Sequence, residues 1–271
     1  MKLGVQQVLT EIRESLQQGQ KDLAAMYLAQ PDHEAYLLGR SHLVDKLLTQ
    51  LWDAAHLPKS AALIAVGGYG RGELYPHSDI DVLIALEHPP TPEVETALER
   101  LISQFWDIGL AVGHSVRTID ECISAASSDI TVQTALYESR LICGQAKLQK
   151  TLHQRIEASM VADQFIAAKL AEQEERHLRF AFSAFSLEPN YKESPGGLRD
   201  IHSLNWVAQA AGFGGRNNAW QALQNDALMQ GDERVALERA AGFLADVRIR
   251  LHLLTGRAED RLLFDIQGQI A

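Results

Sequence analysis

The sequence has few of the features that mark exported, membrane-spanning or disulfide-stapled proteins. It contains two cysteines, Cys122 and Cys143, which are too few for a disulfide framework and are not spaced as a CxxC motif. No stretch reaches about 18 consecutive apolar residues, and the first thirty residues carry charge where a signal peptide is apolar. We therefore expect a protein of the reducing cytoplasm, with neither export nor membrane insertion.

Long runs of basic residues are also missing. The chain has 25 Lys and Arg against 35 Asp and Glu, a formal net charge of −10. A protein that binds long nucleic acid needs clustered cations to neutralise phosphates, so we do not expect nucleic acid as a partner. With 271 residues, 46% of them hydrophobic, the chain can bury one sizeable core or two smaller ones.

The pattern of apolar residues changes twice along the chain. It recurs at three and four residues over 1–56, which predicts amphipathic helices broken near Pro31. Short β-rich runs then predict a mixed α/β domain over 57–140, and helical periodicity returns over 141–271. We therefore predict an α+β fold, in which a small mixed sheet is flanked by N-terminal helices and a C-terminal helical domain.

At least three strands and one intervening helix are expected in the α/β part. The strands are predicted at the runs AALIAVGG, DIDVLIAL and LAVGHSVRTI. Between the last two, Thr91 and Pro92 predict a helix start, and its buried face is expected to contain Leu98, Leu101, Ile102 and Phe105. The runs DITVQTALYESRLI and VADQFIAAKLAEQEERHLRFAFSAF are interpreted as helices, and both cysteines are placed in helical stretches.

Two carboxylates stand two residues apart in the second predicted strand. Asp79 and Asp81 alternate with Ile80 and Val82, so both carboxylates are expected on one face of the sheet. Paired oxygen ligands suit Mg²⁺, which keeps further coordination positions for phosphates and water. Two such ions about 3.5–4 Å apart could clamp an in-line displacement, so the pair is predicted as both catalytic and metal-binding.

Glycines precede these carboxylates by a short spacer. The first predicted strand runs into Gly67 and Gly68, whose backbone can approach a phosphate closely because it carries no Cβ atoms. Ser78 adds a hydroxyl directly before the first carboxylate. A glycine pair and a DxD run are each common by chance, but their order, strand, glycine pair, strand, favours a nucleotide site.

This order resembles that of the polymerase-β-like nucleotidyltransferases. The runs GGYGRGELYPHSDID, WDIGLAVGHSVRT and SPGGLRDIHSLNWVA further resemble the bacterial PII uridylyltransferase/uridylyl-removing family. The resemblance implies Mg²⁺-dependent transfer of UMP from UTP to a tyrosine of the PII nitrogen-regulatory protein, with release of pyrophosphate. It further implies that the chain corresponds to the transferase part alone, without the HD hydrolase and ACT domains of that family.

One position departs from the pattern. Members of the superfamily usually carry a third carboxylate on a neighbouring strand, and at the matching place this chain has Ala111. Since a third acid completes the metal ligands or helps to deprotonate the attacking hydroxyl, its absence predicts nucleotide binding with reduced turnover. A catalytically weak, nucleotide-binding regulatory module is therefore an alternative, and so is a protein adenylyltransferase.

Three cations are candidates for contact with the nucleotide. Arg71 follows the first glycine pair and could touch the triphosphate, although turn-borne charges are more often solvated or paired with each other. Lys192 and Arg199 flank a second glycine pair at the start of a predicted helix, where backbone N–H groups and two cations could hold phosphate. The alternative for this second segment is an ordinary helix N-terminus, with Asp200 near its positive end.

Overall fold

A computed structural model describes the backbone of residues 2–180, 186–215 and 219–270. In these residues the chain forms two compact units, Met1–Ser159 and Met160–Ala271. The predicted division into 1–56, 57–140 and 141–271 stays a prediction, although α7 (Ala146–Ser159), which it assigned to the helical domain, packs against the sheet of the first unit.

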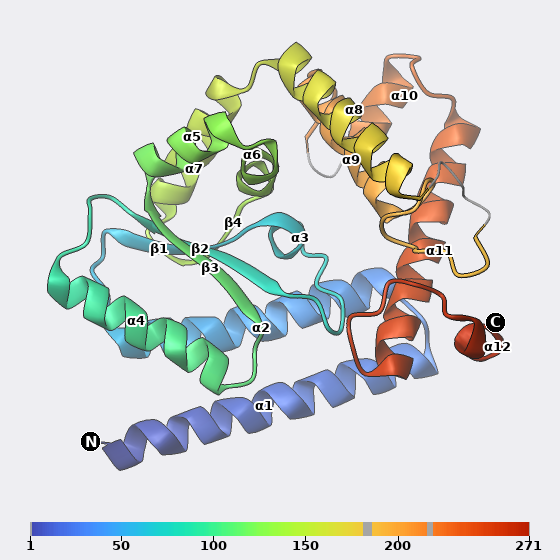
Figure 1. Ribbon diagram of the computed structural model, residues 1–271. Helices are drawn as coiled ribbons and strands as arrows, with labels where there is room; N and C mark the ends of the chain where they lie inside the picture. Colours follow the sequence, from blue (N-terminus) through green and yellow to red (C-terminus); the bar gives the residue numbers. More distant parts are fainter. Residues whose placement is uncertain (1, 181–185, 216–218, 271) are drawn as a thin grey trace. The chain divides into compact units, whose positions relative to one another are not determined.

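The first unit is built on a sheet that has four strands in its described residues. β1 (Ala61–Ala65) pairs antiparallel with β2 (Ile80–Leu86) and with β4 (Arg140–Gly144), and β2 pairs parallel with β3 (Val112–Thr118). The strand order is β3-β2-β1-β4. A mixed sheet among helices confirms the predicted α+β class (Figure 1).

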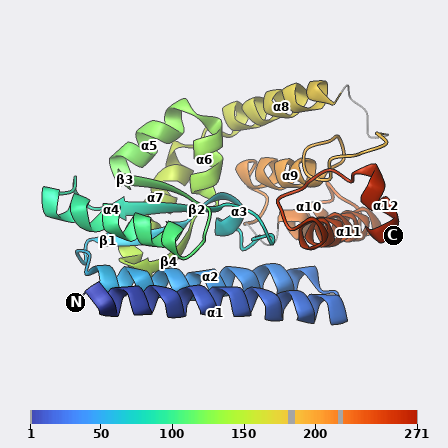
Figure 2. The same ribbon diagram turned by 60° about the horizontal axis from the view of Figure 1, so that its bottom comes forward.

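Helices cover both faces of this sheet. α2 (His33–Ala55) and α4 (Pro92–Asp107) pack on one face, and α1 (Lys2–Ala29) lies along α2. The other face carries α5 (Ile119–Ser128), α6 (Ile130–Tyr137) and α7, and Figure 2 shows the sheet between the two groups. The residues predicted as the buried face of α4 are indeed buried: Leu98, Leu101, Ile102 and Phe105.

Local sequence explains where the first two helices begin and end. The break between them falls at 30–32, as predicted, and the Asp32 side chain accepts a hydrogen bond from the N–H of Ala35 at 2.9 Å. This N-cap satisfies one of the donors that a helix start leaves without an intrahelical acceptor.

The prediction of a helix over DITVQTALYESRLI was wrong in its second half. α6 ends at Tyr137, and the chain then enters β4, which contains Cys143. β4 pairs with the edge of β1 that β2 leaves open. Because buried backbone groups need hydrogen-bond partners, the open edge of a buried strand determines the structure of this segment more strongly than the apolar pattern does.

The second unit is helical. It contains α8 (Ala162–Arg179), α9 (Leu198–Ala210), α10 (Ala219–Asn225) and α11 (Gly231–Thr255), followed by η1 (Phe264–Ile266) and α12 (Gln267–Ile270). α8, α10 and α11 all pack on α9, and α10 also contacts α11. The predicted continuation of α8 through the run AFSAF lies outside the described residues. Among the described helices, none combines the length and hydrophobicity that crossing a membrane requires.

Candidate active site

The first glycine pair and the carboxylates meet at one end of the sheet. β1 and β2 are antiparallel, and the N–H of Val66 donates to the carbonyl of Asp81 at 3.0 Å. Gly67 therefore follows β1 beside the point where β2 begins. On the other side of β2, the N–H of Ile80 donates to the carbonyl of Ala111 at 2.9 Å, which brings the start of β3 to the same end.

The glycine pair forms a single helical turn, α3 (Gly67–Gly70), rather than an open turn. Gly67 has φ +57°, a conformation that side chains rarely adopt, and a Cβ atom added there would meet no atom within 4 Å. The N–H groups in the first turn of a helix have no intrahelical acceptor. The backbone at Gly67 is thus open in space and has donors that suit an anion. At Gly68 an added Cβ would make only ordinary contacts, the nearest at 3.6 Å to the Arg71 guanidinium.

The two carboxylates are exposed, and the apolar residues that alternate with them are buried. Ile80 and Val82 are 1% and 2% exposed, whereas Asp79 and Asp81 lie at the surface, which follows the predicted alternation. In the parallel pairing of β2 with β3, Asp81 lies opposite Gly113. A Cβ atom on Gly113 would overlap the Asp81 Oδ1 atom. Glycine at position 113 therefore makes the room that the Asp81 carboxylate occupies.

The neighbouring strand supplies no third carboxylate. Ile80 pairs with Val112, so Ala111 lies next to Asp79, and Gly113 lies next to Asp81. Among the residues that the structure describes, no group of three or more His, Cys, Asp and Glu side chains could hold a metal ion. Asp79 and Asp81 fit a hard cation such as Mg²⁺ by their oxygen chemistry, provided that phosphate and water complete its coordination.

Arg71 is committed to two ion pairs inside the first unit. Its guanidinium lies 2.9 Å from Glu73 and 2.6 Å from Glu138, and the Glu138 side chain is only 5% exposed. Burial alone would lower the pKa of Arg71, but the two carboxylates outweigh it and raise that pKa. The pairing with Glu73 is the alternative considered from the sequence. Contact between Arg71 and a nucleotide stays a prediction.

A second set of contacts holds the other side of α3. The Tyr69 hydroxyl donates to Asp45 at 2.5 Å, and Arg140 donates to both oxygens of Asp45 at 2.7 and 3.1 Å. The Arg140 guanidinium also lies 5.4 Å from the centre of the Tyr69 ring. Burial and the nearby Asp45 carboxylate raise the pKa of Tyr69, so its hydroxyl stays protonated as a donor.

The spacer between the glycines and the carboxylates is anchored to α2. Arg40 donates to the carbonyl of Tyr75 at 3.0 Å, and the Ser41 hydroxyl donates to the carbonyl of Gly72 at 3.1 Å. Ser78, the predicted phosphate donor, is half-buried, and its N–H donates to the carbonyl of Tyr75 at 3.1 Å. The nucleotide-binding role of its hydroxyl stays a prediction.

Sequence reasoning missed these anchoring residues. Arg40 and Ser41 are polar residues on the buried side of α2, where the apolar pattern expects hydrocarbon, and this exception was a usable signal. Asp45 and Arg140 gave no comparable signal, because the two partners lie 95 residues apart in the chain.

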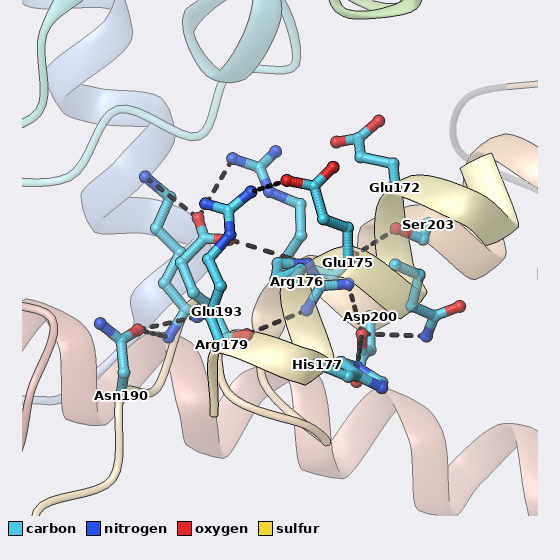
Figure 3. Close-up of polar contacts among 12 residues, drawn as sticks. Glu172, Glu175, Arg176, His177, Arg179, Asn190, Glu193, Asp200 and Ser203 are labelled. Carbon is cyan, nitrogen blue, oxygen red and sulfur yellow. Dashed lines mark hydrogen bonds and ion pairs between the residues drawn. The ribbon is translucent and has the colours of Figure 1, made fainter. Parts of the chain in front are cut away.

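Lys192 and Arg199 belong to the second unit. Both approach the carboxylate of Glu193, at 3.7 Å and 3.5 Å respectively. Figure 3 shows Glu193 in this cluster, together with Arg176 and Asp200. The structure therefore brings Lys192 and Arg199 together with each other, and their role toward a nucleotide stays a prediction.

The second glycine pair offers no free backbone donors in the way that the sequence suggested. The N–H of Gly196 donates to the Asp200 carboxylate at 2.7 Å, and those of Gly197 and Leu198 donate to backbone carbonyls at 2.8 and 2.9 Å. The N–H of Arg199 donates to the carbonyl of Lys192 at 2.9 Å. Phosphate binding by these N–H groups was thus the wrong alternative, because the segment satisfies its own donors.

The comparisons with known proteins match both units. A family model described as GlnD PII-uridylyltransferase matches residues 164–271, and one described as a nucleotidyltransferase domain matches residues 46–131. The chain is 46% identical to a bifunctional uridylyltransferase/uridylyl-removing enzyme of Aromatoleum aromaticum over 267 residues, which cover 98% of this chain and 31% of the relative.

Further relatives with the same name give a similar picture. One from Thiobacillus denitrificans is 44% identical over 96% of this chain and 30% of its own length. Another from Bordetella avium is 50% identical over 84% of this chain and 26% of its own length. The chain thus spans less than a third of the curated relatives that it matches, and the family resemblance expected from the sequence is confirmed.

Proposed function

Because the chain belongs to the family of the bifunctional uridylyltransferase/uridylyl-removing enzymes, we propose that its first unit carries a Mg²⁺-dependent nucleotidyltransferase site. In this proposal UMP passes from UTP to a tyrosine hydroxyl of the PII nitrogen-regulatory protein. The tyrosine hydroxyl releases its proton to solvent and its oxygen forms a bond to the α-phosphorus, the bond from that phosphorus to the bridging oxygen breaks, and pyrophosphate leaves with the electron pair. The two free thiols of the chain agree with a cytoplasmic reaction.

One observation carries the proposal. The hydrogen bond between Val66 and Asp81 joins the open backbone of Gly67 to the exposed pair Asp79 and Asp81 at one end of the sheet. A triphosphate needs donors for its oxygens and a cation to neutralise its charge, and these residues offer both within one strand pairing.

The residues of the chain have separate parts in this reaction. The backbone of Gly67 and Gly68, with the Ser78 hydroxyl, binds phosphate oxygens, while Asp79 and Asp81 hold Mg²⁺. A Mg²⁺ ion held there would supply positive charge that neutralises the triphosphate oxygens. Within the second unit, we assign phosphate binding to Lys192 and Arg199.

The contacts around α3 support catalysis by fixing the phosphate-binding backbone before the nucleotide arrives. Tyr69, Arg71 and the spacer are tied to Asp45, to Glu138 and to α2, respectively. A segment that is already ordered loses less conformational entropy on binding, and it holds reacting groups in line.

The experiment measures transfer of labelled UMP from UTP to purified PII protein in the presence of Mg²⁺. We expect Asp79→Asn and Asp81→Asn each to lower the rate about 100-fold or more, since metal ligands stabilise the transition state by several kcal/mol. Both side chains are exposed, so the melting temperature should hardly change. Asp120→Asn, at an exposed carboxylate that pairs with Arg155, is the matched control and should leave the rate unchanged. Undiminished transfer by the Asp81 variant would exclude this site.

A second candidate is a nucleotide-binding module with little turnover. The observation that favours it is the lack of a carboxylate at two positions: Ala111, directly before β3 and beside Asp79, and Gly113, on β3 and beside Asp81. The same assay decides between the two candidates. Binding of UTP without transfer of label would favour the module, and preference for ATP in a competition assay would favour adenylyl transfer.

A further inference from the structure

Three cations in the second unit converge on one carboxylate without closing tightly on it. Arg199 Nη2 and Lys192 Nζ lie 3.5 and 3.7 Å from Glu193 Oε1, and Arg176 Nε lies 3.8 Å from Glu193 Oε2. Charge-assisted hydrogen bonds normally measure about 2.7–2.9 Å, so these pairs are loose. The Glu193 side chain is 30% exposed and has a way out to solvent.

The neighbouring carboxylates are held much more closely. Arg176 Nη2 lies 2.6 Å from Asp200, and Arg248 Nε lies 2.6 Å from Asp260. Figure 3 shows Arg176 and His177 both directed at Asp200. Burial alone would raise the pKa of Asp200, but hydrogen bonds from Arg176, from the N–H of Gly196 and from His177 outweigh it and lower that pKa. Asp200 and Asp260 are therefore anions held by short ion pairs, whereas the ion pairs of Glu193 are longer.

Arg176 has a buried donor that no acceptor satisfies. Its side chain is 7% exposed, and its Nε atom makes no hydrogen bond although its Nη1 and Nη2 atoms do. A buried donor on a charged group that lacks an acceptor is destabilising, because it has given up its hydrogen bonds to water. This N–H group faces the Glu193 carboxylate from a distance that a larger tetrahedral anion could span.

The cluster carries an excess of positive charge in an acidic protein. Four cations, Lys192, Arg199, Arg176 and Arg248, stand against the three carboxylates Glu193, Asp200 and Asp260. The chain as a whole has a formal net charge of −10. Burial, Arg248 and Arg199 together lower the pKa of Lys192, which reflects this crowding of cations.

The backbone around Glu193 is fixed, so only its side chain needs to move. The Asn190 side chain accepts hydrogen bonds from the N–H groups of Lys192 and Glu193 at 3.0 and 2.7 Å, and Arg176 donates to the Glu193 carbonyl at 3.0 Å. Gly197 fits against the carbonyls of this loop, where a Cβ atom would lie 2.9 Å from three oxygens. The cations are thus held in place whichever anion they face.

We propose that Lys192, Arg199 and Arg176 form a binding site for a phosphate group, and that the Glu193 carboxylate occupies this site until a phosphate displaces it. The inference deepens the proposed function and rests on it for the source of the phosphate, which is the triphosphate of a nucleotide or free pyrophosphate. Glu193 then acts as an internal competitor that weakens binding and releases the ligand readily.

The test uses the whole chain, inorganic pyrophosphate as the probe and a chelator that removes divalent metal. Calorimetry should show Glu193→Gln binding pyrophosphate about three- to tenfold more tightly than the unchanged chain, because displacement of a loose ion pair no longer opposes binding. Lys192→Met and Arg199→Met should each weaken binding by a similar factor. Glu175→Gln is the matched control, since it removes the same charge from an exposed pair with Arg179 on α8.

Several outcomes would overturn the inference. They are equal or weaker binding by Glu193→Gln, equal tightening by Glu175→Gln, or no pyrophosphate binding by any variant. If Glu193→Gln fails to fold by its melting curve, Glu193→Ala takes its place, and a loss of stability without tighter binding counts against the site.

The source of the phosphate follows from parallel titrations with UTP under chelation. The same gain for UTP assigns the site to the nucleotide, and a gain confined to pyrophosphate assigns it to the free product. The titration under chelation does not depend on metal binding by Asp79 and Asp81, so the two proposals can fail separately. If the chain transfers no UMP but Glu193→Gln still tightens pyrophosphate binding, only the proposed function is refuted. If UMP transfer depends on Asp81 but Glu193→Gln does not tighten pyrophosphate binding, only the phosphate site is refuted.

Discussion

The chain contains the same dipeptide, Gly-Gly, at the start of a helix in each unit, and the two copies are used in opposite ways. At Gly67 a side chain would enter open space, and the first-turn N–H groups have no intrahelical acceptor. At Gly197 a side chain would collide with three carbonyl oxygens, and the N–H groups nearby donate to the chain itself. The first copy presents its backbone outward, and the second uses the absence of Cβ atoms to pack.

The difference indicates which groups of each unit are available to bind a charged ligand. In the first unit we propose that backbone donors and two carboxylates bind the nucleotide and its metal, while the cations Arg71 and Arg140 form ion pairs with Glu138 and Asp45. In the second unit the backbone is closed, so side-chain cations carry the recognition that we propose. A glycine pair before a helix is therefore no evidence of a phosphate site until its donors are counted.

The contrast between the two units would fail most clearly if Arg71 bound phosphate instead of stabilising the fold through its ion pairs. Arg71→Met leaves Glu138, which is 5% exposed, without its cation, and we expect the free energy of unfolding to fall by about 3 kcal/mol or more. Urea denaturation measures this loss. Arg155→Met removes a cation from an exposed pair and should cost below about 1 kcal/mol. Unchanged stability with weaker UTP binding would return Arg71 to the nucleotide.

Substitution at Gly113 tests the position of the Asp81 carboxylate, because it displaces this group without changing its chemistry. A Cβ atom on Gly113 overlaps Asp81 Oδ1, and the flexible end of the Asp81 side chain is what gives way. We expect Gly113→Ala to lower the rate of UMP transfer about 10- to 100-fold, since displacements near 1 Å have such effects on positioned groups. Stability should change little. Gly109→Ala, on the loop before β3, tests whether any glycine loss nearby has this effect, and equal rate losses would contradict the role of Gly113.

The two glycine pairs can be compared directly by Gly67→Ala and Gly197→Ala. The first places a methyl group in a left-handed conformation, which costs about 1–2 kcal/mol, and projects it where we place the phosphates. The second has ordinary backbone angles but overpacks, at about 1–3 kcal/mol. We expect UTP affinity to fall more in the Gly67 variant and stability more in the Gly197 variant. Titration and urea denaturation of both variants check this, and the reverse order would refute the contrast.

The sequence predicted those parts of the fold that depend on residues close together in the chain. Alternation placed Ile80 and Val82 inside, and helical spacing placed the apolar face of α4, because both depend on residues a few positions apart. β4 and the braces around α3 escaped prediction for one reason. They depend on partners such as Asp45 and Arg140, whose 95-residue separation only the folded chain closes.

The candidate site divides in the same way. The strand, glycine pair and DxD order predicted which residues meet, because β1 and β2 are neighbours in sequence and in the sheet. The state of each donor was beyond the pattern. Nothing in SPGGLRD indicates that Asp200 takes the N–H of Gly196, or that Glu193 stands among three cations.

The smallest expected effect concerns the position where a third carboxylate would complete the first site. Ala111 is exposed, lies beside Asp79 through the pairing of Ile80 with Val112, and contributes its backbone carbonyl to that pairing. A carboxylate there adds an oxygen ligand or a proton acceptor without disturbing the sheet, so Ala111→Asp should raise UMP transfer about two- to tenfold. Ala111→Asn has the same shape without the charge and should give no gain. Rates measured at saturating Mg²⁺ that are equal or lower in the Asp variant would mean that two carboxylates already suffice, and the weak-module candidate would lose its main support.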